Sequence, residues 1–206
     1  MITKIIHEDK IQKAHKYIEK GESFVIVTHV SPDGDAIGSA LGLFHFLNAY
    51  GKENVSVIVP NDYPNFLKWI PGTKDVTIYE KYPEFSEQLI SEADVIFCLD
   101  FNDPKRIEKL ADPVLKSEAR KVLIDHHLHP VEFCNVTMSY PNISSTSEMV
   151  FRFICRMGLF DLIDKNAAEC IYTGMMTDTG AFTYNSNHPE IYTIIGELIK
   201  LGIDKD

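Results

Sequence analysis

The chain has 206 residues, of which 45% are hydrophobic and 24% are charged, and this composition is typical of a folded globular protein. Its formal net charge of −10 disfavours general attraction to nucleic acid, because proteins that bind the phosphate backbone normally carry a basic face. No run of about 18 apolar residues predicts a membrane-spanning helix, and the first residues lack the apolar stretch of a secretory signal. We therefore expect a cytoplasmic protein with no membrane partner.

Short apolar segments alternate with helical patterns along the whole chain. Strands are predicted over residues 24–27, 55–59, 95–99 and 122–124, and their almost continuous apolar character is typical of strands covered on both faces. Helices are predicted over residues 10–20, 36–50, 84–92, 145–157, 166–177 and 189–201. This alternation predicts an α/β fold of three layers, with a mainly parallel central sheet flanked by helices.

Several residues are predicted to end these helices, to cap them or to lie in the contacts between them. Gly21 and Gly51 follow two of them directly, and we predict that both are left-handed helix terminators. Ser145 and Glu148 have the spacing of a capping box at the start of another helix. Gly38 and Gly42 are predicted to allow close packing between helices. The four cysteines are widely spaced and are interpreted as buried thiols, not as a disulfide framework or a zinc site; they are Cys98, Cys134, Cys155 and Cys170.

Acidic and histidine residues follow three of the four predicted strands. His29, Asp33 and Asp35 come after the first strand, Asp100 follows the third, and residues 125–127 (Asp-His-His) follow the fourth. In an open parallel sheet, ligands bind beyond the carboxyl ends of the strands. The recurrence of metal-ligand residue types at three such ends therefore predicts a single site.

Two further features complete this candidate site. The Pro32-Asp33-Gly34 segment favours a tight turn that would bring His29, Asp33 and Asp35 around one point, and Asp178 stands at the predicted end of a helix. Four carboxylates and two imidazoles from among these residues form a ligand set that suits manganese, with magnesium, cobalt or iron as weaker alternatives. Six ligands exceed the number that one catalytic ion normally uses, so we expect two cations about 3.5–4 Å apart, with Asp100 between them.

These residues resemble the signature motifs of the DHH phosphoesterase family. The motifs are His29-x-x-x-Asp33-x-Asp35, then Asp100, then Asp125-His126-His127, and finally Asp178, and they occur in the family's order. The family includes RecJ-type exonucleases, oligoribonucleases that also dephosphorylate adenosine bisphosphate, cyclic dinucleotide phosphodiesterases and manganese pyrophosphatases. The resemblance implies a hydrolase that uses two divalent cations, with Mn²⁺ preferred and Mg²⁺ or Co²⁺ possible.

The same resemblance implies a role for each residue. His29 and Asp33 would hold one cation, whereas Asp35, His126 and Asp178 would hold the other, and Asp100 would bridge the two. His127 would face the substrate as a catalytic residue, where its counterpart in the family neutralises charge or protonates the leaving oxygen. Asp125 would orient the two histidines from behind.

The segments around Ser144–Glu148 and Thr177–Phe182 resemble the oligoribonuclease and adenosine 3′,5′-bisphosphate phosphatase branch of the family. Arg106 is placed like an arginine of that branch and is predicted to hold a substrate phosphate. Ser145 and Thr146 are predicted either to cap their helix or to bind phosphate at its N-terminus. The expected substrate is short single-stranded RNA or a nucleotide phosphate.

We expect residues 1–186 to form the catalytic domain and residues 187–206 to form a helix leading to a second, substrate-binding (DHHA1-type) domain that is absent from this sequence. A homodimer is also possible within the family. Other readings are a manganese pyrophosphatase or exopolyphosphatase, a cyclic dinucleotide phosphodiesterase, and a non-catalytic nucleotide or metal sensor. Retention of Asp100 and both histidines argues against the sensor.

Overall fold

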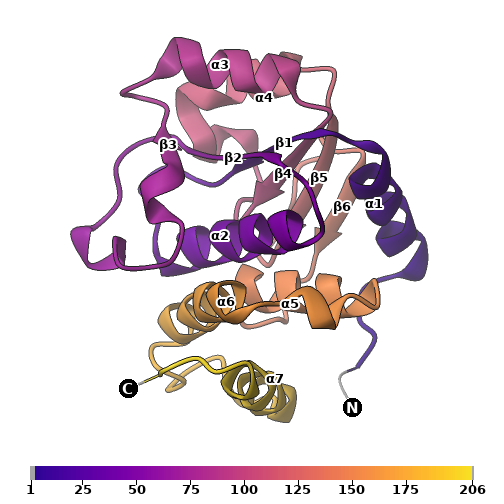
Figure 1. The fold of residues 1–206 in the computed structure, drawn as a ribbon, viewed down its shortest axis with the longest axis vertical. Coiled ribbons are helices and arrows are strands. Elements are labelled where there is room, and N and C mark those ends of the chain that lie inside the picture. Colours follow the sequence, from indigo (N-terminus) through magenta and orange to yellow (C-terminus); the bar gives the residue numbers. More distant parts are fainter. Residues whose placement is uncertain (1–2, 206) are drawn as a thin grey trace.

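The computed structural model of the protein describes residues 3–205 and contains one six-stranded sheet in which every neighbouring pair of strands is parallel (Figure 1). The strand order is β3-β2-β1-β4-β5-β6. The strands are β1 (Ser23–Val27), β2 (Asn54–Val59), β3 (Val76–Ile78), β4 (Val95–Leu99), β5 (Arg120–Asp125) and β6 (Val136–Ser139). The predicted α/β class with a parallel central sheet is confirmed.

Helices follow most of the strands. The α-helices are α1 (Glu8–Lys20), α2 (Gly34–Ala49), α3 (Pro83–Glu92), α4 (Ala111–Lys116), α5 (Thr146–Arg156), α6 (Lys165–Asp178) and α7 (Pro189–Lys200). Short 3₁₀ helices are η1 (Asn65–Leu67), η2 (Thr73–Asp75), η3 (Pro104–Leu110) and η4 (Phe160–Leu162). All six predicted helices are present, each with bounds that differ by a few residues at most.

The central strands bury both faces, as their apolar sequences predict. Along β1, Phe24 and Ile26 belong to one hydrophobic cluster, whereas Val25 and Val27 belong to a second cluster on the opposite face. This division follows from the two-residue repeat of a strand. The first cluster receives side chains from α1, α2, α5, α6 and α7, and the second from α3, η3 and α4. Figure 1 shows these helix layers on either side of the sheet.

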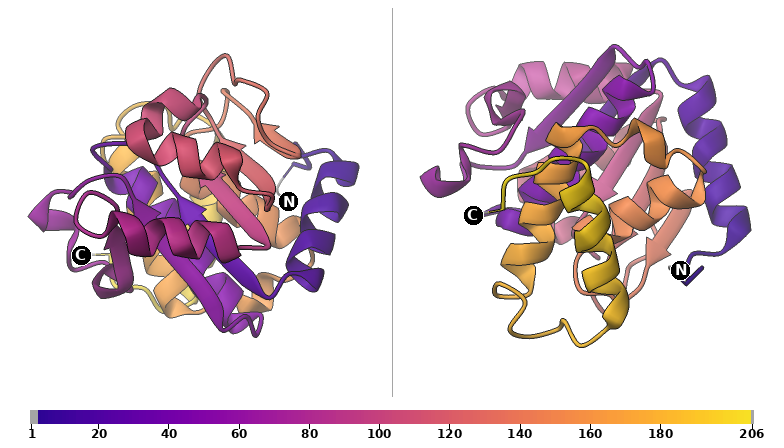
Figure 2. Two further views of the ribbon diagram at one scale, coloured as in Figure 1. Left: turned by 90° about the horizontal axis from the view of Figure 1, so that it is seen from above. Right: turned by 60° about the horizontal axis from the view of Figure 1, so that its bottom comes forward.

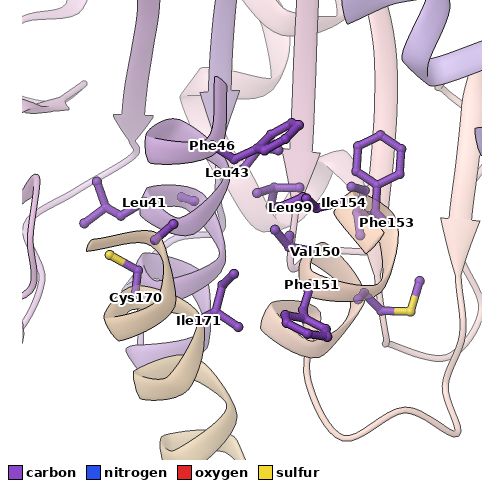
Figure 3. Packing of buried hydrophobic residues seen from close by; sticks show 14 of the residues in the cluster. Leu41, Leu43, Phe46, Leu99, Val150, Phe151, Phe153, Ile154, Cys170 and Ile171 are labelled. Carbon is purple, nitrogen blue, oxygen red and sulfur yellow. The ribbon is translucent and has the colours of Figure 1, made fainter. Parts of the chain in front are cut away.

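The larger cluster depends on close contact between α2 and α6. An added Cβ at Gly38 would lie 2.6 Å from the carbonyl oxygen of Cys170, and one at Gly42 would lie 2.8 Å from Ile171 Cγ1. Both glycines therefore allow the two helix backbones to approach, as predicted. Figure 3 shows the side chains that fill the space between these helices and the strands, including Phe46 of α2 and Val150 of α5.

The order in which the chain adds strands to the sheet changes direction between β1 and β4, although all the strands stay parallel. The chain runs outward from β1 to β2 and β3, then returns to place β4 on the other side of β1 and continues to β5 and β6. In open α/β sheets this switch point creates a crevice at the carboxyl ends of the strands. The segments that carry His29 and Asp100 leave β1 and β4 at this crevice.

Some local predictions were wrong. Gly51 is left-handed, with φ of 93°, but Gly21 has φ of −75° and ψ of 147°, so it ends α1 in an extended conformation. Ser145 caps α5 by accepting from the Glu148 N–H, but the Glu148 carboxylate accepts from Ser144 and not from the cap residue. Two edge strands, β3 and β6, and the short helix α4 were not predicted, because both strands contain polar residues among the apolar ones and α4 has only six residues.

The last helix, α7, packs against α6 on the side away from the sheet (Figures 1 and 2). Its buried side chains, Ile191, Ile194 and Leu198, belong to the same cluster as the sheet residues. The proposed division after residue 186 and a following second domain stay predictions. Among the helices of residues 3–205, none is both long and apolar enough to cross a lipid bilayer.

Candidate metal centre

His29 follows β1 and is almost completely buried. Its Nδ1 lies 2.8 Å from the carbonyl oxygen of Val30, and because a carbonyl can only accept, Nδ1 is the donor in this bond. Nε2 is therefore the nitrogen left to act as a ligand. It lies 3.4 Å from Oδ2 of Asp100 and 3.8 Å from Oδ1 of Asp33.

Asp33 combines two roles at the start of α2. Its Oδ1 accepts hydrogen bonds from the backbone N–H groups of Asp35 and Ala36, both at 3.0 Å. This is the N-cap arrangement, in which a side-chain oxygen satisfies helix donors that have no partner within the helix. The cap fixes the carboxylate beside His29, so a local helix-start signal also positions a candidate ligand.

Asp35 lies in the first turn of α2 and has 1% of its surface exposed. Its two carboxylate oxygens accept from the backbone N–H groups of Thr146, at 2.6 Å, and Ser147, at 2.8 Å. These donors belong to the first turn of α5, where helix N–H groups need outside acceptors. The start of one helix therefore orients a carboxylate carried by another.

Asp100 stands at the centre of the site, directly after β4. Its backbone has φ of 65°, a left-handed conformation that side-chain-bearing residues seldom adopt and that is found at functional sites. Its Oδ1 accepts from the Thr146 hydroxyl at 2.9 Å and lies 3.7 Å from Nε2 of His126 and 3.8 Å from Nδ1 of His127. With Oδ2 beside His29, the carboxylate faces three imidazoles.

His126 closes the other side of the site. Its Nδ1 bonds to the carbonyl oxygen of Ile143 at 3.2 Å, which leaves Nε2 directed at the carboxylates. Nε2 lies 3.4 Å from Oδ2 of Asp178, the last residue of α6. It also lies 3.9 Å from Oδ2 of Asp35.

The second histidine of the pair is held differently. Nδ1 of His127 donates to Oδ1 of Asp125 at 2.7 Å, and its backbone N–H donates to Oδ2 of the same carboxylate at 2.9 Å. We expected Asp125 to orient both histidines, but it contacts His127 alone, and the Ile143 carbonyl orients His126. Asp125 is fully buried, whereas His127 is partly exposed.

The side chains fall into three groups whose potential ligand atoms all lie within 4.8 Å of one another. The groups are His29–Asp33–Asp100, Asp35–His126–Asp178 and Asp100–His126–His127. Asp100 belongs to the first and third groups, and His126 belongs to the second and third. The structure thus brings together all six residues that the sequence analysis named as candidate ligands.

Burial and mutual repulsion raise the pKa of two carboxyl groups in the site. Burial is the largest cause of the raised pKa of Asp35, followed by the negative charges of Asp100 and Asp178. Burial likewise raises the pKa of Asp178, to about 6, with Asp100 and Asp33 adding to the effect and His126 opposing it. Both shifts show carboxylates that lack enough positive charge nearby.

At Asp100, the neighbouring imidazoles offset the effect of burial on the carboxyl group. Burial alone would raise the pKa of Asp100, but the hydrogen bond and charge of His29, with the charges of His126 and His127, lower it to about 2. Burial acts to lower the pKa of His29, but the hydrogen bond and charge of the Asp100 carboxylate outweigh it, so the pKa is raised. The pKa of His127 is raised mainly by its hydrogen bond to Asp125, so this imidazole retains a proton more readily than a free one.

The donor set fits divalent cations. It consists of carboxylate oxygens and imidazole nitrogens with no sulfur, the combination suited to manganese or magnesium and not to a structural zinc site. The imidazole nitrogens that face the carboxylates are those left free by backbone carbonyls. Uncompensated negative charge in a buried crevice also favours a cation.

The three residues proposed to hold a substrate phosphate differ in accessibility. Arg106 is partly exposed and its Nη1 lies 3.5 Å from the backbone oxygen of Asp100. Ser145 and Thr146 are completely buried, and their hydroxyls are engaged with the Glu148 N–H and with Asp100. The phosphate contacts of all three stay predictions.

Sequence reasoning missed the main-chain groups that orient the site. These are the carbonyl oxygens of Val30 and Ile143 and the N–H of Ser147. A residue's type carries no signal for a main-chain contact across the fold, since every residue has the same backbone groups. Gly174 was also missed: an added Cβ there would lie 2.8 Å from Oδ1 of Asp35.

Fold and site together define an open α/β protein that gathers aspartate and histidine side chains at the switch point of its sheet. Residues 23–175 match the model of the DHH family, N-terminal domain. The chain therefore belongs to the DHH family.

Individual relatives support this assignment. The chain is 35% identical over 178 residues to the bifunctional oligoribonuclease and PAP phosphatase NrnA of Thermus thermophilus, covering 86% of this chain and 50% of the relative. It is 23% identical over 175 residues to the cyclic-di-AMP phosphodiesterase GdpP of Bacillus subtilis, covering 81% of this chain and 26% of that protein. The chain spans at most about half the length of these curated relatives.

The fold also matches solved structures. An exopolyphosphatase-related protein from Bacteroides fragilis superposes with a TM-score of 0.98 and is 60% identical, over all of this chain and 60% of that one. A putative family II inorganic pyrophosphatase from Methanococcus jannaschii has a TM-score of 0.60 and 16% identity over 86% of this chain and 55% of its own. The second likeness concerns the fold alone.

Proposed function

We propose that the chain is the catalytic part of a metal-dependent phosphoesterase that hydrolyses short oligoribonucleotides, adenosine 3′,5′-bisphosphate or both. The observation that carries the proposal is the sharing of Asp100 between two groups of candidate ligands, one with His29 and Asp33 and the other with His126 and His127. The NrnA-type relative supports the choice of substrate. A cytoplasmic location and a possible homodimer accompany this proposal as predictions.

In the proposed enzyme, His29 and Asp33 would hold one cation, Asp35, His126 and Asp178 would hold a second, and Asp100 would contribute to holding both. Manganese is the preferred metal, with magnesium or cobalt as alternatives. When bound, the cations supply Lewis-acid stabilisation of the charge that develops on the phosphoryl group. The remaining work is done by side chains that position these ligands or handle a proton.

His127 is the proposed general acid. The hydrogen bond from Nδ1 to Asp125 fixes the ring and raises the pKa of the imidazole, so Nε2 is the nitrogen from which a proton could pass to a leaving oxygen. Its partial exposure leaves it accessible to a substrate. Thr146 and Ser147 keep the carboxylates of Asp35 and Asp100 oriented.

The test is an activity assay of the full-length protein with Mn²⁺, using a short RNA and adenosine 3′,5′-bisphosphate as substrates. Asp100→Ala should reduce kcat at least about 100-fold, a loss at the upper end of that seen when groups supporting a metal site are removed. Asp112→Ala is the matched control, because Asp112 is exposed on α4 and, among residues 3–205, forms an ion pair with Lys116 alone. Absence of hydrolysis of both substrates by the wild-type protein would refute the proposal.

Two observations justify a wider substrate panel. The 60% identical structure is of an exopolyphosphatase-related protein, and other relatives are cyclic-di-AMP phosphodiesterases. Polyphosphate, pyrophosphate and cyclic di-AMP should therefore be assayed beside the two proposed substrates. A non-catalytic sensor is distinguished by Asp100→Ala, since a sensor would show no turnover to lose while retaining nucleotide binding.

A further inference from the structure

A cavity of about 740 Å³ opens beside the candidate metal centre. His126 and His127 form the wall next to the centre, the segment around Asn142 forms another, and the segment before α7, with Asn187 and His188, forms a third. The volume lies within the range of sites that enclose small organic ligands. A molecule whose phosphate lies at the centre would therefore place its remaining part in this cavity.

The chemistry of the walls disfavours a ligand made of phosphate groups alone. No lysine or arginine lines the cavity among the residues that the structure describes. Its one acidic side chain, Glu148, is buried and paired with Arg152 at 2.7 Å. A chain of phosphates carries negative charge along its length and is normally held by several cationic side chains, which these walls do not provide.

The walls instead offer neutral amides and apolar surface. Asn142, Asn185 and Asn187 are exposed at the cavity, and within residues 3–205 their side-chain amides have no hydrogen-bond partner. Each amide has donors and an acceptor that match the edges of a nucleobase. Leu128, directly after the histidine pair and 64% exposed, and Ile191 supply apolar contacts.

Beside the third wall, the start of α7 is joined to α5 by ion pairs. Nη2 of Arg152 on α5 lies 2.7 Å from Oε1 of Glu148 and 2.7 Å from Oε2 of Glu190 on α7. Glu190 follows the amide-bearing segment by only a few residues, and α5 is the helix whose first turn orients Asp35. The start of α7, which follows Asn185 and Asn187 in the chain, is thus tied to α5 by an ion-pair network.

We propose that this cavity binds the nucleoside part of the substrate, and that Asn142 and Asn187 select a nucleobase over a base-free phosphate. This inference rests on the proposed function, because it takes the phosphate to lie at the candidate metal centre. It narrows the substrate class to nucleotides and short oligonucleotides and disfavours pyrophosphate and polyphosphate.

The experiment compares binding of adenosine 5′-monophosphate and ribose 5-phosphate by the full-length protein in Mn²⁺, measured by calorimetry. The wild-type protein should bind the nucleotide at least about 10-fold more tightly. Asn187→Trp, which fills the cavity, should lower this ratio by about 10-fold, and Asn142→Ala should lower it about 3- to 10-fold, as expected for a lost hydrogen bond. Asn65→Trp, at an exposed position in η1, is the matched control and should keep the wild-type ratio.

Three outcomes would overturn the inference: equal affinity of the wild-type protein for both ligands, binding of neither, or a ratio that both cavity variants leave unchanged. Because the measurement needs no turnover, it separates the two proposals. A protein that hydrolyses no phosphoester but shows the Asn187-dependent ratio would refute the proposed catalytic function and support the nucleoside site. A protein that hydrolyses phosphoesters but binds adenosine 5′-monophosphate and ribose 5-phosphate equally would support the catalytic function and refute the nucleoside site.

Discussion

The backbone N–H of Thr146 donates a 2.6 Å hydrogen bond to Oδ2 of Asp35, although 111 residues separate the two in the sequence. The hydroxyl of the same threonine donates to Oδ1 of Asp100 at 2.9 Å. One residue at the start of α5 therefore ties together carboxylates from two different strand ends. This contact links the second half of the chain to the crevice formed by the first half.

Replacing Thr146 tests the importance of that link. Thr146→Val keeps the backbone donor and the side-chain shape but leaves a buried oxygen of Asp100 without its hydroxyl partner, which should lower the free energy of unfolding by about 1–3 kcal/mol. We expect kcat to fall about 10-fold as well. Thr146→Ser retains the hydroxyl and should stay close to the wild type in urea unfolding and in turnover. Equal behaviour of the two variants would contradict the role of the hydroxyl.

Asp125 should act through His127. Asp125→Asn leaves one side-chain oxygen for the two N–H donors of His127, so one of the two hydrogen bonds is lost. The substitution also removes the negative charge that helps to raise the pKa of this imidazole. The expected fall in kcat is about 10- to 100-fold. Affinity for Mn²⁺, measured by calorimetry, should change less than in Asp100→Ala, because Asp125 belongs to none of the three ligand groups. Equal losses of metal affinity would place Asp125 among the ligands instead.

The contact between α2 and α6 should tolerate no added atom at Gly38. Gly38→Ala places a methyl group 2.6 Å from the Cys170 carbonyl oxygen and 2.8 Å from the Gly174 nitrogen, and the forced separation should cost about 1–3 kcal/mol of stability. Gly196→Ala is the matched control. It lies inside α7 with no atom within 4 Å of the added Cβ, so it should stabilise the protein by about 0.5–1 kcal/mol. Chemical denaturation of both variants measures the difference.

Binding of a divalent cation should stabilise the fold independently of catalysis. A ligand that binds only the folded state raises the melting temperature, and the carboxylates gathered around Asp100 repel one another without it. A chelator should therefore lower Tm and abolish activity, and Mn²⁺ should restore both better than Ca²⁺, whose longer bonds and higher coordination number suit this site poorly. The rise in Tm should be lost in Asp100→Ala and kept in Asp112→Ala. Equal rescue by Ca²⁺ would count against the proposed ligand set.

Much of the fold could be predicted from local patterns. The four buried strands are almost continuously apolar, and α1, α5 and α7 show the apolar periodicity of helices with one buried face, so these elements were identified. The edge strands β3 and β6 were not, because each contains a threonine among its apolar residues and so lacks the continuous apolar run of the four central strands. The extended end of α1 at Gly21 was also missed, since a glycine permits a left-handed terminator without requiring one.

The sequence by itself determined which side chains belong to the site, because His29, Asp100 and the Asp125–His127 segment each follow an apolar strand whose end must lie at one edge of a parallel sheet. Only the tertiary structure decided how these side chains are oriented. Their partners are backbone groups from distant segments, such as the N–H of Ser147 and the carbonyl of Ile143. Backbone groups are the same in every residue, so their contacts arise from the packing of α5 against the sheet and leave no mark in residue type.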